Sequence, residues 1–489
     1  MTLLAGLDVG TSSVKGLLVS SEDGEVVARA EVEHALSTPR PGWAEQDPED
    51  WWAGAQAVLA ALGDAGEIGG IGLTGQMHGL VALDDADRVL RPAMLWNDGR
   101  TGAECAEIER RIDLDSLIAQ TGNRALPGFT APKLLWLERH EPDVYARIRR
   151  VLLPKDYVRL RLCGEHATDV ADASGTLLFD VAQRRWSAGV VEALGVDPSW
   201  LPRVLESPQV SGVTGEGTRA GGAPVPAGIP VAAGAGDQAA GALGVGVDRP
   251  GPASVVLGTS GVVFAASEAF AADREARVHA FCHAVPGAWH AMGVMLSAAG
   301  SLRWLRDAVA PGLSDFGALV AEAERWEPGA EGLTFLPYLA GERTPHANPD
   351  ARGAFTGLSL RHDRGALTRA VLEGVAFGLR DGLDLVGELS SRTELGRVSG
   401  GGARSELWLR ILASVLELPL QRVAVDEGAS FGAALLGGVA AGVFADVHEA
   451  VAACVRPGAI VEPVADWIEP YREARERYVA LYPALYPGA

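Results

Sequence analysis

Lysine is scarce in this sequence of 489 residues: Lys15, Lys133 and Lys155 are the only lysines among 42 basic residues. Acidic residues number 63, and the formal net charge is −21. This charge disfavours nucleic acids and anionic membranes as partners, because affinity for both rests on basic side chains. Two explanations stay open for the three lysines: sequence drift, or positions that need a compact ammonium group rather than a planar guanidinium.

Cysteine is also rare, with four copies scattered at positions 105, 163, 282 and 454. No CxxC pair and no His/Cys metal-ligand spacing occurs, so we expect reduced, structural thiols. No stretch approaches the roughly 20 apolar residues that span a bilayer. The amino terminus carries no basic region typical of a secretory signal. These absences predict a cytoplasmic protein without a membrane partner, and the length is sufficient for two α/β domains.

The P-loop signature GxxxxGK[ST] is absent, but a different glycine turn occurs twice. Gly6–Leu18 reads GLDVGTSSVKGLL, and Val255–Ala266 reads VVLGTSGVVFAA. In each copy Gly-Thr-Ser joins two apolar, strand-like runs. Backbone N–H and hydroxyl groups in such a turn suit phosphate oxygens. The repetition therefore predicts two halves of related build that hold one polyphosphate between them.

The order of expected elements is that of an α/β protein. The first half is predicted to contain a hairpin, a third strand, a helix capped by Asp47 and a buried strand, at 3–9 with 14–20, 25–33, 48–62 and 68–73. Residues 207–230 are rich in proline and glycine and predict a loop, followed by strand, turn and helix over 231–247. We expect a domain boundary near 247–253. Later expected elements are a helix at 373–386, a strand, glycine turn and helix at 397–416, and helices at 429–444 and 471–486.

Two carboxylates stand at the ends of strand-like runs. Asp8 comes directly before the first Gly-Thr-Ser, and a buried carboxylate is costly unless it is paired or binds a metal. We favour a Mg²⁺-associated carboxylate, acting directly or through water, over a turn-capping aspartate. Asp237 lies in GAGDQ between a strand and a helix. The small residues around it leave space for a substrate, so we favour a general base over a helix N-cap.

Three further polar groups are less specific. Gln76, Met77 and His78 leave a strand together and suit a small polyol pocket, with ordinary turn chemistry as the alternative. Asn97 and Asp98 in LWNDGR have the same two interpretations. The glycines of GGGA at 400–403 allow a base or ribose to approach the backbone closely. The loop Gly341–Pro345 (GERTP) has no derivable role beyond an internal ion pair between Glu342 and Arg343.

Together these motifs resemble the FGGY carbohydrate kinases, and among them most of all the bacterial xylulokinases. The resemblance extends from the first strand to the terminal helix. It is carried by both Gly-Thr-Ser elements and by two long segments, PGFTAPKLLWLERHEP at 127–142 and GAFTGLSLRHDRGALTRAVLEGVAF at 353–377. GWAEQDPEDWW, TGQMHG, LWNDGR, LLPKDY and LAGERTPH are similar to xylulokinase sequences in particular.

The resemblance implies a two-lobed α/β fold of the actin and hexokinase (ribonuclease H-like) ATPase type, with duplicated domains and a central cleft. The lobes would be 1–247 and 248–489, with the last helix returning to the first lobe. The implied activity is phosphorylation of D-xylulose to xylulose 5-phosphate with ATP and Mg²⁺. Alternatives are another ketose or polyol as substrate, or a non-catalytic nucleotide sensor. A homodimer is expected only because relatives often form one.

The resemblance also assigns site residues. Asp237 would be the catalytic base and Asp8 the metal-linked carboxylate, with both near Mg²⁺. Sugar contacts would come from Met77, His78, Asp98 and Gln238. Nucleotide contacts would come from Thr11, Ser12, Lys15, Gly258, Thr259, Ser260, Gly401, Gly402 and Ser405. Many xylulokinases have Asn where this chain has Gln238, so this residue is a weaker candidate for sugar contact than Asp237.

Overall fold

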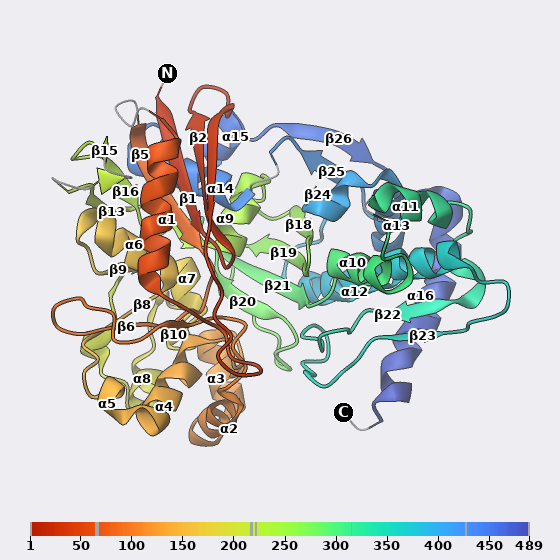
Figure 1. The fold of residues 1–489 in the computed structure, drawn as a ribbon, viewed down its shortest axis with the longest axis horizontal. Coiled ribbons are helices and arrows are strands. Elements are labelled where there is room, and N and C mark those ends of the chain that lie inside the picture. The colour runs from red at the N-terminus through yellow and green to blue at the C-terminus, as the bar shows by residue number, and fades with distance from the viewer. Residues whose placement is uncertain are drawn as a thin grey trace.

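The computed structural model describes residues 2–63, 68–215, 219–220, 223–313, 315–425 and 428–487. Two mixed sheets of seven strands each, covered by helices, confirm the α/β class and the two-lobed build. Figure 1 shows the lobe from the first half of the chain on the left, in red to yellow, and the second lobe on the right, in green to blue.

The first sheet has the order β13-β16-β5-β1-β2-β3, with β17 paired to β5. Its strands are β1 Leu3–Val9, β2 Ser13–Ser20, β3 Val26–Glu33, β5 Ile68–Gly75, β13 Val210–Val213, β16 Pro230–Ala232 and β17 Ala235–Gly236. The principal helices of this lobe are α1 Pro48–Ala61, α2 Gly102–Arg111, α3 Leu114–Thr121, α4 Thr130–His140, α6 Pro154–Cys163, α7 Val170–Ser174, α8 Ala188–Leu194 and α9 Asp237–Gly244.

The second sheet has the order β20-β21-β19-β18-β24-β25-β26. Its strands are β18 Pro252–Leu257, β19 Gly261–Ser267, β20 His279–Cys282, β21 Trp289–Met295, β24 Leu395–Ser399, β25 Leu420–Val423 and β26 Pro457–Val461. The later helices are α10 Ala299–Val309, α11 Phe316–Ala323, α12 Arg364–Leu389, α13 Glu406–Leu416, α14 Gly428–Ala440, α15 Val447–Cys454 and α16 Ala465–Leu485.

The two sheets share a core topology. In the first, β1 is antiparallel to β2 and parallel to β5. In the second, β18 is antiparallel to β19 and parallel to β24. Each antiparallel hairpin carries one Gly-Thr-Ser turn. This repeated arrangement explains why the same short motif occurs once in each half of the chain.

The helix α1 shows how local sequence sets these elements. Asp47 caps it by accepting a hydrogen bond from the Glu49 amide at 3.0 Å, and Pro48 is tolerated in the first turn, where its missing N–H leaves no helical bond unmade. Trp51, Ala55 and Val58 recur at helical spacing and are fully buried, and α1 packs on β2 and β3. The predicted helix and its cap are confirmed.

One helix from the second half of the chain lies against the first sheet. Helix α14 packs on β5, β1 and α9 (Figure 1). Glycines allow this approach, because a Cβ on Gly72 would lie 1.7 Å from the Ala433 carbonyl oxygen. The terminal helix α16 packs instead on α13, β22 (Thr334–Leu336) and α12 of the second lobe. The expectation that the last helix returns to the first lobe is therefore wrong, and α14 takes that position.

The described residues of the proline- and glycine-rich segment 207–230 include strands that the composition did not predict. It contains β13 and the short strands β14 (Arg219–Ala220) and β15 (Ala223–Pro224), and it leads into β16. β13 pairs antiparallel with β16 and extends the first sheet by one strand. Prolines at strand ends and edges cost no ladder hydrogen bond, which is why this composition is compatible with strands.

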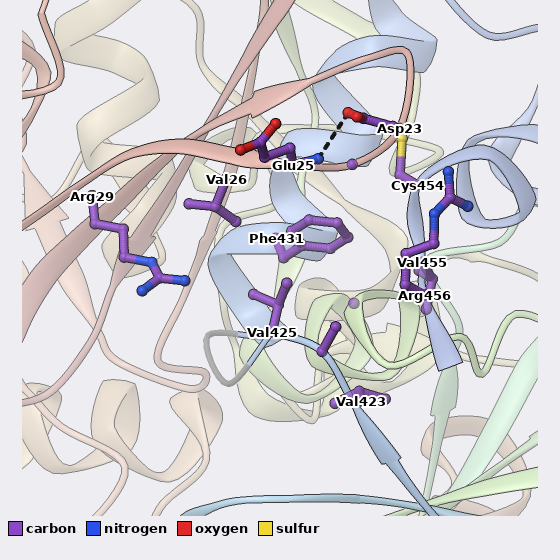
Figure 2. Close-up of a pocket in the computed structure, with 13 residues that line it drawn as sticks. Asp23, Glu25, Val26, Arg29, Val423, Val425, Phe431, Cys454, Val455 and Arg456 are labelled. Carbon is purple, nitrogen blue, oxygen red and sulfur yellow. Dashed lines mark hydrogen bonds between the residues drawn. The ribbon is translucent and has the colours of Figure 1, made fainter. Parts of the chain in front are cut away.

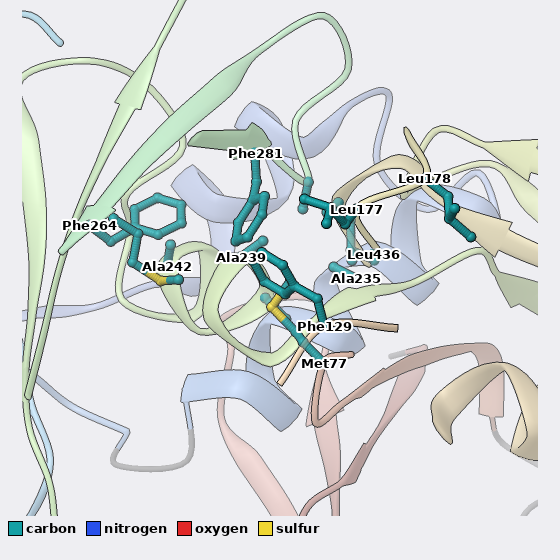
Figure 3. Close-up of a cluster of buried hydrophobic side chains, with 14 of the residues drawn as sticks. Met77, Phe129, Leu177, Leu178, Ala235, Ala239, Ala242, Phe264, Phe281 and Leu436 are labelled. Atoms are coloured by element: carbon teal, nitrogen blue, oxygen red, sulfur yellow. The ribbon is translucent and has the colours of Figure 1, made fainter. Parts of the chain in front are cut away.

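A continuous apolar cluster joins the lobes. It includes Met77, Phe129 and Ala239 from the first half of the chain and Phe264 and Phe281 from the second. Figure 3 shows Met77 and Phe129 beside Phe281, which comes from β20. The ring centroids of Phe129 and Phe281 are 6.3 Å apart. Across the residues that the structure describes, every helix is too short or too polar to traverse a lipid bilayer.

Candidate active site

The register of the first sheet brings the two candidate carboxylates to the same edge. Asp8 on β1 pairs with Thr74 on β5, and Thr74 pairs on its other side with Ala235 on β17. All three strands run parallel, and α9 begins at Asp237 directly after β17. Adjacent strands lie about 4.8 Å apart, so Asp8 and Ala235 are separated by about two strand spacings, and Asp237 follows Ala235 by two residues.

Asp8 occupies a desolvated position. Burial raises the pKa of its carboxyl to about 6, and the charge of Lys15, its partner across the hairpin, acts in the opposite direction. Its Oδ1 atom is buried without a hydrogen-bond partner, as is Thr74 Oγ1 beside it. A turn-capping aspartate would use these oxygens on backbone amides, so this alternative does not fit. A carboxylate oxygen without a hydrogen-bond partner is a suitable ligand for a hard cation such as Mg²⁺, or for a water molecule bound to that cation.

Asp237 is the first residue of α9, and the N-cap position belongs to Gly236. The N-cap alternative therefore does not describe Asp237. Burial, together with the nearby charge of Asp8, raises the pKa of its carboxyl to about 7, and Gln238 opposes the increase. A carboxylate that titrates near neutral pH has the proton affinity required of a general base.

The first Gly-Thr-Ser turn points its carbonyl groups into the protein. The Thr11 carbonyl accepts from Gln46 Nε2 at 2.6 Å, and the Ser12 carbonyl accepts from the His34 amide at 3.1 Å. The Thr11 and Ser12 amides have no acceptor among the described residues. They are therefore available to an anion, as expected for a phosphate-binding turn.

The Thr11 side chain braces the turn. Its hydroxyl donates to Gln76 Oε1 at 3.1 Å and accepts from Trp96 Nε1 at 3.0 Å. The predicted phosphate contact of Thr11 therefore falls to its backbone amide, and it stays a prediction. Gln76 belongs to the same brace, because its Nε2 donates to Gln46 Oε1 at 3.0 Å, so it does not line a sugar pocket. Ser12 is exposed, and Lys15 is half-exposed at 3.7 Å from Glu31.

In the second Gly-Thr-Ser turn the carbonyl groups also point into the protein, but they are held by other groups than in the first turn. The carbonyls of Gly258 and Thr259 accept from the Ala299 and Ala298 amides at 2.8 and 2.9 Å, at the start of α10. Within the described chain, the Thr259 and Ser260 amides have no acceptor. Thr259 is exposed and Ser260 half-buried, so both hydroxyls remain accessible.

The glycines at 400–402 lie beside this second turn, because β24 is parallel to β18. A Cβ on Gly401 would meet nothing within 4 Å, which leaves open space for a ligand. A Cβ on Gly402 would lie 2.5 Å from the Leu257 side chain, so this glycine is required for packing. Ser405 caps α13 by accepting from the Trp408 amide at 3.2 Å. Gly402 and Ser405 thus have structural roles, and their expected nucleotide contact stays a prediction.

Met77 and His78 follow β5 and lie next to the base. Met77 packs against Gly236, where any Cβ would lie 2.7 Å from its Cγ. His78 Nδ1 lies 2.6 Å from the Gly175 carbonyl oxygen, and burial lowers the pKa of the imidazole to about 3. Because a carbonyl can only accept, Nδ1 carries the proton and the neutral ring presents Nε2 as an acceptor. This suits a sugar hydroxyl.

Lys133 positions His78 and was not among the predicted site residues. His78 has a φ of 70°, an uncommon conformation for a residue other than glycine. Its carbonyl accepts from Lys133 Nζ at 2.9 Å and from Thr130 Oγ1 at 3.0 Å, and Lys133 also donates to the Gly128 carbonyl at 2.6 Å. The rarity of lysine was the available signal, and the ammonium is used here as a compact donor to two carbonyls.

Asp98 forms a buried ion pair with Arg100. Oδ2 accepts from the Ala44 amide at 2.7 Å and from Arg100 Nη2 at 2.6 Å, and Oδ1 accepts from Arg100 Nε at 2.9 Å. The predicted sugar contact of Asp98 stays a prediction. Gln238 is half-buried and follows Asp237 directly, where it acts to lower the pKa of that carboxyl.

Behind the site, Lys155 stands inside a fully buried group of carboxylates. Its Nζ lies 2.7 Å from Asp156, 2.7 Å from Asp169 and 3.0 Å from Asp172. The ammonium occupies the position that a metal ion would need between these carboxylates. Arg159 pairs with Asp156 at 2.6 Å and also donates to the Ala233 carbonyl. Ala233 precedes β17, so this cluster anchors the segment that carries Asp237.

A cavity of about 490 Å³ lies elsewhere, between the β2–β3 turn and the segments around Val423 and Arg456. Figure 2 shows Val26 and Arg29 on the left of this cavity and Cys454, Val455 and Arg456 on the right, with Asp23 next to Cys454. Asp23 follows the end of β2 that is remote from the first glycine turn. None of the predicted site residues lines this cavity.

The chain is similar in sequence to known carbohydrate kinases along most of its length. The model of the FGGY family of carbohydrate kinases matches this chain at residues 3–244 for the N-terminal domain and 253–441 for the C-terminal domain. The xylulose kinase of Escherichia coli (strain K12) is 45% identical over 491 residues, which cover 99% of each chain. The xylulose kinase of Klebsiella pneumoniae is 46% identical over 440 residues, with 89% of each covered.

Solved structures confirm the fold. The xylulose kinase from Rhodospirillum rubrum aligns with a TM-score of 0.91 and 36% identity, with 99% of each chain covered. The gluconate kinase from Lactobacillus acidophilus aligns with a TM-score of 0.93 at 24% identity, covering 100% of this chain and 99% of its own. The two-lobed, actin-like ATPase fold predicted from the sequence is therefore correct. Because kinases named for different sugars share it, the fold alone does not select the sugar.

Proposed function

The chain belongs to the FGGY family of carbohydrate kinases, and from this premise we propose that it transfers the γ-phosphate of ATP to D-xylulose, giving xylulose 5-phosphate. Identity of 45% to the xylulose kinase of Escherichia coli over nearly the full length supports this sugar. The observation that carries the proposal is the placement of Asp237, with its pKa near 7, beside Met77 and His78 and next to Asp8. The presence of both carboxylates gives no support to a non-catalytic sensor.

In this proposal the phosphates of ATP bind to the free amides of the two glycine turns, at Thr11 and Ser12 and at Thr259 and Ser260. Lys15 and Gly258 contribute to the same regions. Adenosine lies against Gly401, where the structure leaves open space. The turn amides are fixed before substrate arrives, so they stabilise charge on the phosphoryl oxygens without reorganising.

Mg²⁺ fits the residues present. The unpartnered Oδ1 of Asp8 is the oxygen ligand this ion prefers, and Asp237 faces the same region. When bound, the ion would supply positive charge against the phosphate oxygens. Asp8 would hold it directly or through water, and this leaves Asp237 to act on the sugar.

Asp237 accepts the proton of the terminal sugar hydroxyl as this oxygen attacks the γ-phosphorus in line. His78 accepts a hydrogen bond from another sugar hydroxyl at Nε2, and Met77 supplies an apolar wall. The roles of the two side chains are thus positional, while Asp237 holds the proton that leaves the nucleophile.

The direct test is phosphate transfer from ATP measured over a panel of pentuloses, hexuloses, gluconate and glycerol, with ADP release coupled to product identification. We expect the highest kcat/KM with D-xylulose, and phosphate on its terminal oxygen. A higher kcat/KM with another member of the panel would refute the sugar assignment while leaving the kinase class intact.

Three accompanying expectations belong to the same proposal. We propose lobes at residues 1–247 and 248–489, tested by limited proteolysis at the 247–253 connection. We propose a homodimer, tested by light scattering of the purified protein. We propose a cytoplasmic location, tested by cell fractionation. The dimer and the location rest on the family resemblance and the sequence composition.

A further inference from the structure

Two groups of charged residues take no part in the mechanism above. In the loop Gly341–Pro345, which the structure describes in full, Glu342 and Arg343 do not form the ion pair expected from the sequence. Glu342 Oε1 accepts instead from the Leu296 amide at 3.0 Å and from the Arg343 amide at 2.8 Å, which fixes the loop at the end of β21. The second group is the buried cluster around Lys155, and its contacts extend toward the proposed sugar site.

The Lys155 cluster consists of five fully buried charged side chains: Lys155, Asp156 and Arg159 on α6, and Asp169 and Asp172 at α7. Lys155 contacts all three carboxylates, and Arg159 contacts Asp156. A buried ion cluster is a poor source of stability, because the cost of desolvation offsets the attraction between the charges. The backbone groups that the cluster contacts therefore indicate its role better than its charges do.

The first such contact is with α7, which carries the hydrogen-bond acceptor of His78. Asp169 is the N-cap of this helix, and its Oδ1 accepts from two backbone amides of the first turn at 2.8 and 3.0 Å, while its Oδ2 lies 2.7 Å from Lys155 Nζ. Gly175 follows the helix directly, and its carbonyl oxygen lies 2.6 Å from His78 Nδ1. Because α7 has only five residues, the position of its N-cap also sets the position of this carbonyl.

The second contact is with the segment that leads to Asp237. Arg159 Nη2 donates to the Ala233 carbonyl, two residues before β17. Ser207 supports the same segment, because its carbonyl accepts from the amide that follows Ala233 at 2.9 Å and its hydroxyl donates to Asp169 Oδ1 at 3.4 Å. The cluster thus holds the strand that ends at the base as well as the helix that holds His78.

Met77 and His78 lie between these two segments. A Cβ on Gly175 would lie 2.5 Å from His78 Nδ1 and 3.1 Å from Met77 Cε, and a Cβ on Gly236 would lie 2.7 Å from Met77 Cγ. The segments also touch each other, since α7 packs against β17. Packing this close leaves no free space on either side, so a shift of α7 or β17 would displace the side chains proposed to hold the sugar.

We propose that Lys155 and Arg159 are positioning residues for the phosphoryl transfer, which hold the His78 acceptor on α7 and the base Asp237 after β17 at a fixed separation. This inference rests on the proposed function. The contact of Lys155 with Asp169 acts on sugar binding, and the contact of Arg159 with the backbone acts on the base. Lysine suits its position because one compact ammonium nitrogen meets three carboxylates, which a planar guanidinium cannot do.

The test compares two conservative variants that each remove one contact. Arg159→Lys keeps a positive charge near Asp156 but loses the forked guanidinium that also reaches the Ala233 carbonyl. Asp169→Asn keeps an oxygen acceptor for the α7 amides but loses the carboxylate that faces Lys155.

Arg369→Lys is the matched control. Arg369 is buried as deeply as Arg159 and lies 2.6 Å from a carboxylate, that of Glu373. It belongs to α12 of the second lobe and donates to Tyr471 on α16, so it has no contact with α7 or β17. Its replacement reports what the loss of a buried arginine does to this protein in general.

D-xylulose affinity is measured by calorimetry without nucleotide, and kcat, both KM values and Tm are measured for each variant. We expect Arg159→Lys to lower kcat by about 10- to 100-fold, because a small displacement of the base is costly to the transfer. Asp169→Asn should weaken D-xylulose binding by about 3- to 10-fold, because His78 is displaced. The KM for ATP should stay within about twofold in both. Arg369→Lys should lower Tm and leave kcat and D-xylulose affinity within about twofold.

A parental kcat in Arg159→Lys, or a parental D-xylulose affinity in Asp169→Asn, would overturn the proposal. Losses of the same size in Arg369→Lys would also overturn it, because they would show a general effect of lowered stability. If Arg159→Lys does not fold, the affinity of Asp169→Asn decides alone. Turnover of the parent protein on the sugar panel tests the proposed function by itself. If another sugar is the better substrate, the same variants are measured with that sugar, so the two failures are distinguishable.

Discussion

In the first lobe the carbonyls of the glycine turn are held by Gln46 and His34, whereas in the second they are held by the first amides of α10. Both turns leave two amides free, so either can hold phosphate. The strands before them differ: Asp8 faces Lys15 across the first hairpin, and Val256 faces Val262 across the second. The comparison indicates that phosphate binding is shared between the lobes, while acid–base and metal chemistry is confined to the first.

The largest expected effect comes from removing the base. Asp237→Asn should lower kcat by about 100-fold or more with the fold intact, because the nucleophile then keeps its proton. We expect an acid limb near pH 7 in the parent enzyme, because Asp237 must lose its proton before it can accept one, and this limb should disappear in the variant. Steady-state kinetics from pH 5 to 9 and circular dichroism measure both; near-parental turnover would remove Asp237 from this role.

The difference between the hairpins is tested by paired substitutions. Asp8→Asn should raise the Mg²⁺ concentration needed for half-maximal rate by about 10-fold or more, because a neutral amide is a weaker ligand for this ion. Val256→Asn at the matching position of the second hairpin should leave that requirement unchanged. Rates measured over a Mg²⁺ titration compare the two, and an equal response of both variants would contradict the asymmetry.

Lysine substitutions sharpen the comparison within the first lobe. Lys133→Met removes two buried hydrogen bonds, including one to the His78 carbonyl, so we expect about a 10-fold increase in KM for the sugar. The KM for ATP should change by less than about twofold, because Lys133 does not contact the glycine turns. An equal increase in both KM values would show a general structural defect instead of mispositioned His78.

The smallest effect is expected at the glycines of the second lobe. Gly401→Ala places a methyl group in open space, so it should raise the KM for ATP by a few-fold if adenosine approaches this backbone. Gly402→Ala places its methyl 2.5 Å from the Leu257 side chain and should instead lower Tm. Kinetics and thermal unfolding of both variants separate the two roles. A Gly401→Ala enzyme with unchanged KM for ATP would exclude the adenosine contact.

Much of the fold could be predicted from the sequence because its signals are local. The hairpin at 3–20, the cap at Asp47 and the helix after Asp237 are set by alternation, capping and glycine placement within a few residues. The position of α14 against the first sheet could not be predicted in this way, because it depends on glycines far apart in sequence, such as Gly72 and Gly437. Local patterns do not show how the two lobes face each other, and this part of the prediction came from the family resemblance.

The site was predicted unevenly for a related reason. Residue types indicate what a side chain can do, and the register of the first sheet brings Asp8 and the strand before Asp237 to the same edge. Residue types do not indicate which neighbours contact a side chain, such as Trp96 at Thr11, Arg100 at Asp98 and the Trp408 amide at Ser405. Lys133 was missed because its contact with the His78 carbonyl joins segments that are far apart in sequence.

The most direct test of the central claim is a crystal structure with D-xylulose, Mg²⁺ and a non-hydrolysable ATP analogue. The account predicts the terminal sugar hydroxyl within hydrogen-bond distance of the Asp237 carboxylate, with phosphate oxygens on the amides of both glycine turns. A sugar bound away from Asp237, or phosphates on only one of the two turns, would contradict it.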